Sequence, residues 1–465
     1  MLAAALALSL ASRAAAASLW TTRLDGSERL ARREVAAAEA DCAAGPAGPS
    51  VRLDTAALEQ PIDGFGAAMT ESSAIVLDSL GWWRRRRALR ELFGAGGLRL
   101  STLRVPIGAS DFARADYSCD DPPSGADPGL TAFSLERCAG PMLPYLRKAK
   151  RLNPALELIG SPWSAPAWMK SNGSMRNGSL KPEYYDAYAR YLARFAAEMK
   201  KAGAPLTYLT MQNEPGYGTD GYPSMTMTAA EQTRFLAGFL GPTLEANGLS
   251  DLKVLVYDHN WSSAAYATAV LSDPGASRYA AGSAFHCYEG SPDMMAPVYA
   301  AFPDKELHFT ECAAGGWEPR FAPSLAFAMR DLIIGDLANG ARSVTMWNLA
   351  LDEHWGPTNH GCLDCRGVIT VLRSSGTYER SPEYYALAHG SLAADPGARR
   401  AASRTEDAPA GFREVALAEP DGSLALIVLN EGPSPVRVRA RAGGTCVSYD
   451  QPAASAATLR WRPWR

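Results

Sequence analysis

The 465-residue sequence lacks three features that would place it in a special class of protein. Its 46 basic and 49 acidic side chains leave a formal charge of −3, so no broad field attracts nucleic acid. No apolar run is long enough to cross a membrane. Eight cysteines are too few for a disulfide-dense scaffold, although an even number is compatible with export. We therefore expect a globular protein with small or neutral partners, no nucleic-acid partner and no stable membrane insertion.

The N-terminal stretch "MLAAALALSLASRAAAAS" has the composition of a leader segment. Its apolar part is too short to span a bilayer, and small residues suited to signal-peptidase cleavage follow at residues 15–18. The basic residue that usually precedes such a segment is missing, and an alanine-rich coil is the alternative. The sequence predicts a signal peptide over residues 1–17 and a secreted or lysosomal location.

Two pairs of cysteines have a spacing that favours local disulfides. Cys119 and Cys138 bracket a turn-rich loop whose freedom in the unfolded chain a disulfide would restrict. Cys362 and Cys365 in "GCLDCRG" suit a small disulfide loop, half a zinc site or a redox pair. No second such pair completes four zinc ligands, so a local disulfide is the interpretation that we favour.

Eight short apolar, β-branched segments end in polar or small residues, and stretches with helical periodicity lie between them. We expect strands at residues 62–69, 100–108, 157–164, 206–214, 253–260, 282–289, 306–312 and 342–351. The clearest helices are expected at residues 134–153, 182–203, 228–248 and 323–341.

This alternation of strand and helix predicts an α/β fold, a (β/α)8 TIM barrel over residues 58–392. A doubly wound sheet is the rival architecture. It is disfavoured because no glycine-rich phosphate loop follows the first strand.

Beyond the barrel the pattern changes to alternating polar and apolar residues with Gly, Asp-Gly and Pro between them. This pattern predicts an antiparallel β-sandwich over residues 393–465. Those strands are too few to close a sandwich, and residues 18–57 are also strand-like, so we expect both termini to build one side domain. Cys42 and Cys446 could then form a disulfide.

One dense basic run, "WWRRRRALREL", begins at Trp82. It could be a patch that binds phosphates or membranes. Ala88, Leu89, Leu92 and Phe93 fall at helical spacing behind the arginines, which favours the solvated face of an ordinary helix.

Polar and aromatic residues gather at the predicted strand ends, which in a barrel of this type share one mouth. Acids, amides and tryptophans without a metal-ligand cluster suit carbohydrates, because sugars offer hydroxyl groups to polar side chains and apolar faces to aromatic rings. We expect no cofactor and no metal. The strand-end residues are Asp111, Trp163, Asn213, Glu214, Asp258, His286, Tyr288, Glu311, Trp347 and Asn348.

Hydrolysis of a glycosidic bond needs two carboxyl groups, and Glu214 and Glu311 are the pair that we select. They end the fourth and seventh predicted strands, in "TMQNEP" and "HFTECAAG", a joint placement that chance rarely produces. Asp111 and Asp258 are weaker candidates because an acid after a barrel strand is often a helix cap. His286 fits a site residue and a satisfied core histidine about equally.

Seven segments, in order, resemble glycoside hydrolase family 30, in particular its branch of acid β-glucosidases (glucosylceramidases). They are "DGFGAAMTESSA", "LRVPIGASDF", "GSPWSAPAWMKSNG", "TMQNEPGYG", "AFHCYEG", "FTECAAG" and "TMWNLALDE". The resemblance covers about residues 20–465 and implies a barrel with a side β-sandwich. Cys287 stands where the lysosomal branch has a tryptophan, and "GPTNHGCLDCRG" follows the bacterial type.

The resemblance also implies roles for individual residues. Glu214 becomes the general acid/base and Glu311 the nucleophile of a retaining mechanism, in which ionised Glu311 raises the pKa of Glu214. The residues implied to line the sugar subsite are Arg104, Asp111, Trp163, Asn213, His286, Tyr288, Trp347 and Asn348.

The expected function is hydrolysis of β-glucosidic bonds, in the manner of a glucosylceramidase or β-glucosidase. The expected partner is a carbohydrate or glycolipid substrate, with contact to a lipid surface conceivable. An endo-β-1,6-glucanase of the same family is one alternative. A non-catalytic carbohydrate-binding relative is the other, and the presence of both acids disfavours it.

Overall fold

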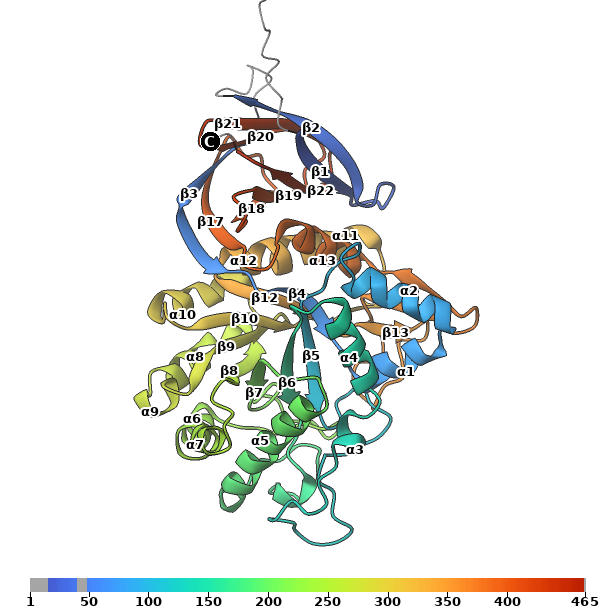
Figure 1. Ribbon diagram of the computed structural model, residues 1–465, viewed down its shortest axis with the longest axis vertical. Helices are drawn as coiled ribbons and strands as arrows, with labels where there is room; N and C mark the ends of the chain where they lie inside the picture. The colour runs from blue at the N-terminus through green and yellow to red at the C-terminus, as the bar shows by residue number, and fades with distance from the viewer. Residues whose placement is uncertain (1–15, 40–47, 464–465) are drawn as a thin grey trace, which may run out of the picture.

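The computed structural model describes residues 16–39 and 48–463, which form two domains (Figure 1). A barrel of parallel strands wrapped by helices makes up the larger domain, and a smaller all-β domain lies at one end of it (Figure 1). Within the described part of the chain, no helix is both long enough and apolar enough to span a membrane.

Eight parallel strands close the barrel, in the spatial order β4–β5–β6–β7–β8–β9–β10–β12. Each lies within or beside a segment that the sequence predicts, so the predicted (β/α)8 architecture is confirmed. The strands are β4 (Gly64–Ala68), β5 (Thr102–Ile107), β6 (Glu157–Pro162), β7 (Tyr208–Thr210), β8 (Lys253–Asn260), β9 (Ala280–His286), β10 (Glu306–Glu311) and β12 (Ala341–Met346).

The predicted helices exist, but most are interrupted. Residues 134–153 form α3 (Leu135–Ala139) and α4 (Leu143–Leu152), because Gly140 and Pro141 separate them. Only α5 (Tyr185–Lys201) is continuous, after a short 3-10 turn at Pro182–Tyr184. The other two contain π-helical segments at Leu236–Leu240 and Ala328–Gly335, flanked by α6 (Ala229–Phe235), α7 (Gly241–Ala246), α11 (Phe321–Phe327) and α12 (Asp336–Ala338).

Both ends of the chain build the smaller domain, as predicted. Its strands pair in the order β1–β2–β21–β20–β3–β17–β18–β19–β22, and β1 lies antiparallel to β22. Residues 1–15 and Cys42 lie outside the described residues, so the signal peptide and the Cys42–Cys446 disulfide stay predictions. The strands are β1 (Ala16–Arg23), β2 (Ala31–Glu39), β3 (Ser50–Pro61), β17 (Arg399–Glu406), β18 (Phe412–Ala418), β19 (Leu424–Asn430), β20 (Val436–Ala442), β21 (Thr445–Gln451) and β22 (Ser455–Trp461).

A buried histidine joins the two domains. His389 lies on α13 (Pro382–Ala393), the helix that packs between barrel and sandwich (Figure 1). Its two ring nitrogens lie 2.9 Å from the hydroxyl oxygens of Thr22 and Thr458. Burial lowers the pKa of His389 to about 3, so the ring is neutral and each nitrogen has a hydroxyl partner.

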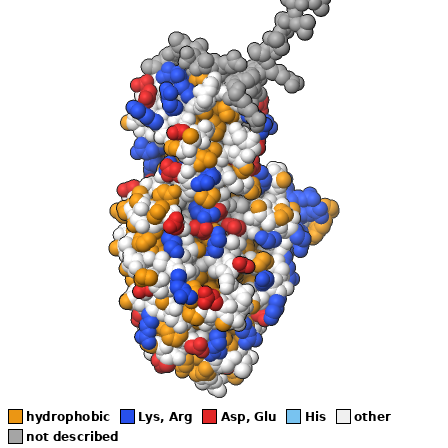
Figure 2. Space-filling view, turned by 60° about the vertical axis from the view of Figure 1, so that its left-hand side comes forward, with side chains coloured by type: hydrophobic (Ala, Val, Ile, Leu, Met, Phe, Trp, Pro, Cys, Tyr) orange, Lys and Arg blue, Asp and Glu red, His pale blue; other side chains and the backbone are white. Residues whose placement is uncertain are grey.

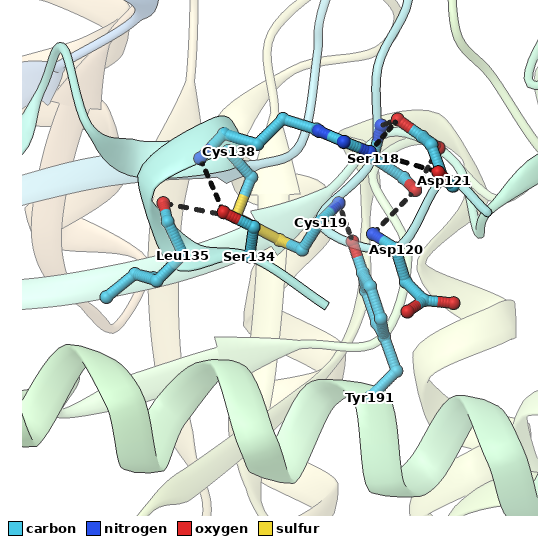
Figure 3. Close-up of a disulfide and its surroundings, with 9 residues drawn as sticks. Ser118, Cys119, Asp120, Asp121, Ser134, Leu135, Cys138 and Tyr191 are labelled. Carbon is cyan, nitrogen blue, oxygen red and sulfur yellow. Dashed lines mark hydrogen bonds and ion pairs between the residues drawn. A yellow bond between two sulfur atoms is a disulfide. The ribbon is translucent and has the colours of Figure 1, made fainter. Parts of the chain in front are cut away.

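The disulfide between Cys119 and Cys138 is present, as predicted (Figure 3). It fixes the long segment after β5, and the hydroxyl of Tyr191 on α5 accepts a hydrogen bond from the Cys119 backbone N–H at 3.1 Å. The neighbouring Asp120 accepts a 3.1 Å hydrogen bond from the Trp168 ring. The disulfide therefore ties the segment after β5 to helix α5 and to the tryptophan-bearing segment after β6.

Candidate active site

A fully buried guanidinium group lies at the centre of the barrel mouth. Arg104 on β5 donates to the carboxylate of Glu311 and to the side chains of Asn213 and Asp258, at 2.6 and 2.8 Å for the latter two. A weaker contact of 3.1 Å reaches Ser161. A guanidinium group with five fixed donors can hold several oxygen atoms in one geometry, so Arg104 sets the positions of residues from four strands or strand ends.

Asp258 at the end of β8 is the buried counterion of this network. One carboxylate oxygen accepts from Arg104, Ser161 and Thr210, and the other from Thr310 at 2.7 Å. Burial raises its pKa, but the Arg104 charge and a hydrogen bond from His286 lower it far more, so Asp258 is ionised. Asp258 caps no described helix, so the cap interpretation is wrong for this residue.

The imidazole of His286 links Asp258 to Glu214. Its Nε2 lies 3.0 Å from Asp258 Oδ1, and its Nδ1 lies 3.2 Å from Glu214 Oε1. Burial lowers the pKa of His286, yet the charge of Glu311 and the bonds to Asp258 and Glu214 raise it to about 9. The ring is therefore a cation near neutral pH.

The backbone holds Glu214 in a left-handed conformation, with φ of 46°. Its N–H donates to the carbonyl of Asp258 at 2.9 Å, and that residue is left-handed too, with φ of 72°. Such a conformation costs free energy for a residue other than glycine and is concentrated at functional sites. The abrupt end of the buried strand β7 thus turns the Glu214 side chain into the mouth.

Glu311, at the end of β10, receives donors from two sides. The phenol of Tyr288 donates to Oε1 at 2.9 Å, and Arg104 donates to Oε2. Both donors favour the carboxylate form that a nucleophile requires.

The two glutamates influence each other's protonation. Burial raises the pKa of Glu311 and the charge of Glu214 raises it further, against the cations His286 and Arg104. Burial also raises the pKa of Glu214, but the hydrogen bond and charge of His286 bring it below the ordinary value. The expectation that Glu214 has the raised pKa is therefore corrected for the free site, because a cation lies against it.

Above these groups lies a cavity of about 470 Å³. Trp163 and Trp347 stack in its wall with ring centroids 4.9 Å apart, and the Arg104 guanidinium lies 4.7 Å from the Trp163 centroid. Asp111 also lines it, and burial with the charges of Glu311 and Glu214 raises the Asp111 pKa well above its usual range. The remaining lining residues are Asn213, Glu214, Tyr217, Tyr222, His259, Asn260, Tyr288, Glu289, Glu311, Ala313, Trp317, Cys362 and Cys365.

The structure brings the predicted site residues together but divides them into two groups. Asp111, Trp163, Asn213, Tyr288 and Trp347 line the cavity beside the two glutamates. The remaining three, Arg104, His286 and Asn348, are fully buried beneath it. The side-chain amide oxygen of Asn348 accepts a hydrogen bond from the Thr70 hydroxyl at 2.8 Å. These three do not line the cavity and contact it only through their neighbours.

Sequence reasoning missed several contributors. His259 and the exposed aromatic residues Tyr217 and Trp317 had no assigned role, because aromatic residues in loops give no periodic signal. The hydroxyls of Thr210 and Thr310 donate hydrogen bonds to Asp258. The sequence carried a signal for both, because each lies an even number of residues before the end of its predicted strand, at residue 214 or 312, and alternate residues of a strand share one face.

A disulfide joins the two strand ends that carry His286 and Glu311. Cys287 pairs with Cys312, 25 residues further along the chain, and the predicted Cys362–Cys365 disulfide is also present at the cavity wall. The first pairing depends on β9 and β10 being parallel neighbours, which the spacing of the cysteines does not reveal.

Among the residues that the structure describes, two groups of side chains have donor atoms close enough to hold a metal ion. Glu214, His259 and His286 lie at the mouth. Asp63, Glu306 and His308 form the other group, but Arg342 already bonds both acids.

Comparison with known proteins bears on the identity of this site. The model of the "Glycosyl hydrolase family 30 TIM-barrel domain" matches residues 62–393, and that of the "Glycosyl hydrolase family 30 beta sandwich domain" matches residues 397–459. The chain belongs to glycoside hydrolase family 30. Its barrel and its side β-sandwich are the two domains that these family models describe.

Two curated relatives with different named activities have the same sequence identity to this family 30 chain. Endo-1,6-beta-D-glucanase neg1 of Aspergillus fumigatus is 31% identical over 80% of this chain and 79% of the relative. Lysosomal acid glucosylceramidase of Mus musculus is also 31% identical, over 80% and 75%. A solved endo-β-1,6-glucanase structure covers 97% of this chain and all of its own, with a TM-score of 0.89 and 30% identity.

Proposed function

We propose that the protein is a retaining β-glycoside hydrolase that cleaves β-glucosidic bonds by double displacement, with a β-1,6-linked glucan as its substrate. The observation that carries the proposal is the opposition of two glutamates in one cavity, each held by a different cation. Arg104 contacts Glu311, and His286 contacts Glu214.

In the first step Glu311 attacks the anomeric carbon and forms a glycosyl ester, while Glu214 gives a proton to the departing oxygen. The proton lies on His286 in the free site, 3.2 Å from Glu214 Oε1, so one hydrogen bond carries it to the acid. Once Glu214 is neutral, its charge no longer raises the pKa of Glu311, and the donors Arg104 and Tyr288 keep that group ionised. Glu214 then takes a proton from the water that releases the sugar.

A glucan is the substrate that we favour because the cavity continues outward into exposed aromatic residues. Tyr217 and Trp317 are 45% and 56% exposed and line the same cavity as the glutamates. Aromatic faces beyond the reacting sugar suit the apolar faces of further sugar rings. Similarity to the endo-1,6-β-glucanase of Aspergillus fumigatus and to the solved endo-β-1,6-glucanase supports the same substrate.

Glucosylceramide is the second candidate, because the mouse lysosomal acid glucosylceramidase is as identical in sequence to this chain as the fungal glucanase is. Its ceramide would leave through the same exposed aromatic region. Both candidate substrates are compatible with a secreted or lysosomal enzyme, which is the location that we propose.

Product analysis separates the candidates. Purified enzyme is given β-1,6-glucan, β-1,3-glucan, glucosylceramide in detergent and an aryl β-glucoside, with Glu311→Gln as the matched inactive variant. We expect short β-1,6-oligosaccharides early in the reaction and a β-anomer as the first product by NMR. A first product of α configuration would refute the double displacement. Turnover of glucosylceramide alone would select the second candidate, and binding without turnover of any substrate would identify a non-catalytic relative.

A further inference from the structure

Two exposed tryptophans and three arginines form a surface cluster on the barrel, called here the Trp–Arg patch. It consists of Trp82, Trp83, Arg86 and Arg90 on α2 (Trp82–Phe93) and Arg151 in the last turn of the adjacent α4. Figure 2 shows orange and blue side chains gathered on a projection at the right-hand edge of the barrel, the side on which α2 lies in Figure 1.

The helical periodicity of α2 accounts for its buried face but not for the exposure of its two tryptophans. Ala88, Leu89 and Leu92 are buried as the sequence predicts. Trp82 is 49% exposed and Trp83 is 76% exposed, at the first turn of the helix. Two adjacent exposed indoles form an apolar area that ordinary soluble surfaces avoid, and such areas mark interaction sites.

The charge around the indoles is positive although the whole chain is slightly acidic. In the described part of the chain, Arg86, Arg90 and Arg151 form no ion pair, whereas neighbouring Arg87 pairs with Glu91 at 2.8 Å. Arg86 lies over the Trp82 ring, 5.5 Å from its centroid. A shallow hollow of about 890 Å³ is lined by both tryptophans and by Arg86, Arg87, Arg90 and Arg151. Glu91 also lines it, but this acid is paired with Arg87 and Arg380. Charge complementarity thus requires a partner with negative groups.

The geometry of the rings selects among anionic partners. Trp82 and Trp83 meet edge to face, at 78° and 4.2 Å between centroids, so they form a wedge. A polysaccharide chain is bound by flat aromatic faces in a row, and Arg86 already covers one face of Trp82. Indole wedges flanked by guanidinium groups instead match the interface of a lipid bilayer, where indoles sit at the headgroups and arginines meet phosphates.

We propose that the Trp–Arg patch is a docking surface for lipid bilayers with anionic phosphate headgroups. The two indoles enter the headgroup layer, and Arg86, Arg90 and Arg151 bind lipid phosphates. The contact is peripheral and reversible, since one helix end and three charges fall far short of an inserted segment. It does not depend on which glycoside the cavity hydrolyses.

The test is sedimentation of the full chain with vesicles of phosphatidylcholine alone or mixed equally with phosphatidylglycerol. The Trp82→Ser/Trp83→Ser and Arg86→Gln/Arg90→Gln variants are compared with Arg404→Gln/Arg462→Gln, which removes two exposed charges from the sandwich. Hydrolysis of a soluble substrate by every variant shows that the fold and the active site are intact.

We expect binding to the mixed vesicles only, weakened roughly tenfold or more by either patch variant. Binding should fall with added salt and be unchanged in the sandwich variant. Equal binding by patch and sandwich variants, or no binding to mixed vesicles, would overturn the proposal. Retention on a soluble uronate polysaccharide without vesicle binding would also overturn it and assign the patch to acidic glycans.

Discussion

The imidazole Nδ1 of His286 lies 3.2 Å from Oε1 of Glu214, while the opposite ring nitrogen lies 3.0 Å from Asp258. Two acids thus hold one imidazolium between them. In the proposed mechanism, this places the catalytic proton beside the acid that delivers it.

Replacement of His286 by Gln should remove a pH dependence of stability. The pKa of His286 is raised to about 9 in the folded protein, from 6.5. The charged His286 ring therefore stabilises the folded protein fully below pH 6.5. This contribution to the free energy of unfolding, up to about 3 kcal/mol, is lost as the pH rises through 9. Urea unfolding at both ends of this window should show the loss in the native protein and little in the variant. An equal loss in both proteins would show that His286 does not carry this charge.

Glu214→Gln should affect substrates according to their leaving groups. A glucoside with a dinitrophenol leaving group needs no proton for departure and should keep a fast first step, while hydrolysis of the glucan should fall by roughly 100-fold or more. Azide should restore turnover of the activated glucoside, because it needs no general base. Initial rates on both substrates measure this, and equal losses would contradict the acid role.

Trp317→Ala should weaken use of long substrates. Loss of one aromatic sugar platform should lower kcat/KM for β-1,6-oligosaccharides by roughly tenfold. Hydrolysis of β-glucosyl fluoride, whose leaving group does not reach this region, should change less than twofold. Replacement of Trp355, which is 43% exposed and does not line the cavity, is the matched control. A uniform loss on both substrates would place Trp317 outside the leaving-group region.

Removal of the Cys287–Cys312 disulfide should cost both stability and turnover. Opening a 25-residue separation should lower the free energy of unfolding by about 3 kcal/mol on the chain-entropy model. Turnover should fall as well, because the adjacent residues His286 and Glu311 belong to the site. The Cys362→Ser/Cys365→Ser variant opens a much shorter loop and should lose less stability. Thermal unfolding and kcat are measured for both double-serine variants. A larger loss of stability or turnover in the Cys362/Cys365 variant would contradict the prediction.

His389→Gln should flatten the acid sensitivity of the domain junction. The pKa of His389 is lowered by burial from 6.5 to about 3, so its contribution is present above pH 6.5 and lost as the pH falls toward 3. At neutral pH the free energy of unfolding of the variant should be lower by about 1–3 kcal/mol, since the buried hydroxyls of Thr22 and Thr458 no longer both have an imidazole partner. Between pH 6.5 and 4.5 it should then lose less stability than the native protein. Urea unfolding at these pH values measures the difference. If the free energy of unfolding falls equally with pH in both proteins, His389 is not a buried neutral imidazole.

Much of the architecture could be predicted from local patterns. Strands such as β8 and β10 are short apolar runs that end in polar residues, and their alternation with helices leaves few topologies. Because the carboxyl ends of parallel strands share one mouth, the pairing of Glu214 with Glu311 followed from their positions alone. The helices were less well bounded: residues 228–248 are interrupted by a π-helical segment that periodicity does not reveal.

The amino-acid sequence was enough to place Glu214 and Glu311 at one mouth, since strand order in a barrel follows chain order. It did not separate the residues that line the cavity from those buried beneath it. Only the tertiary structure decided how they act. The burial of Asp258, the position of His286 between two acids and the closure of Cys287 onto Cys312 depend on distances between strands far apart in the chain. Charge and desolvation act through space, and for that reason the pKa order of the two glutamates is fixed by folding.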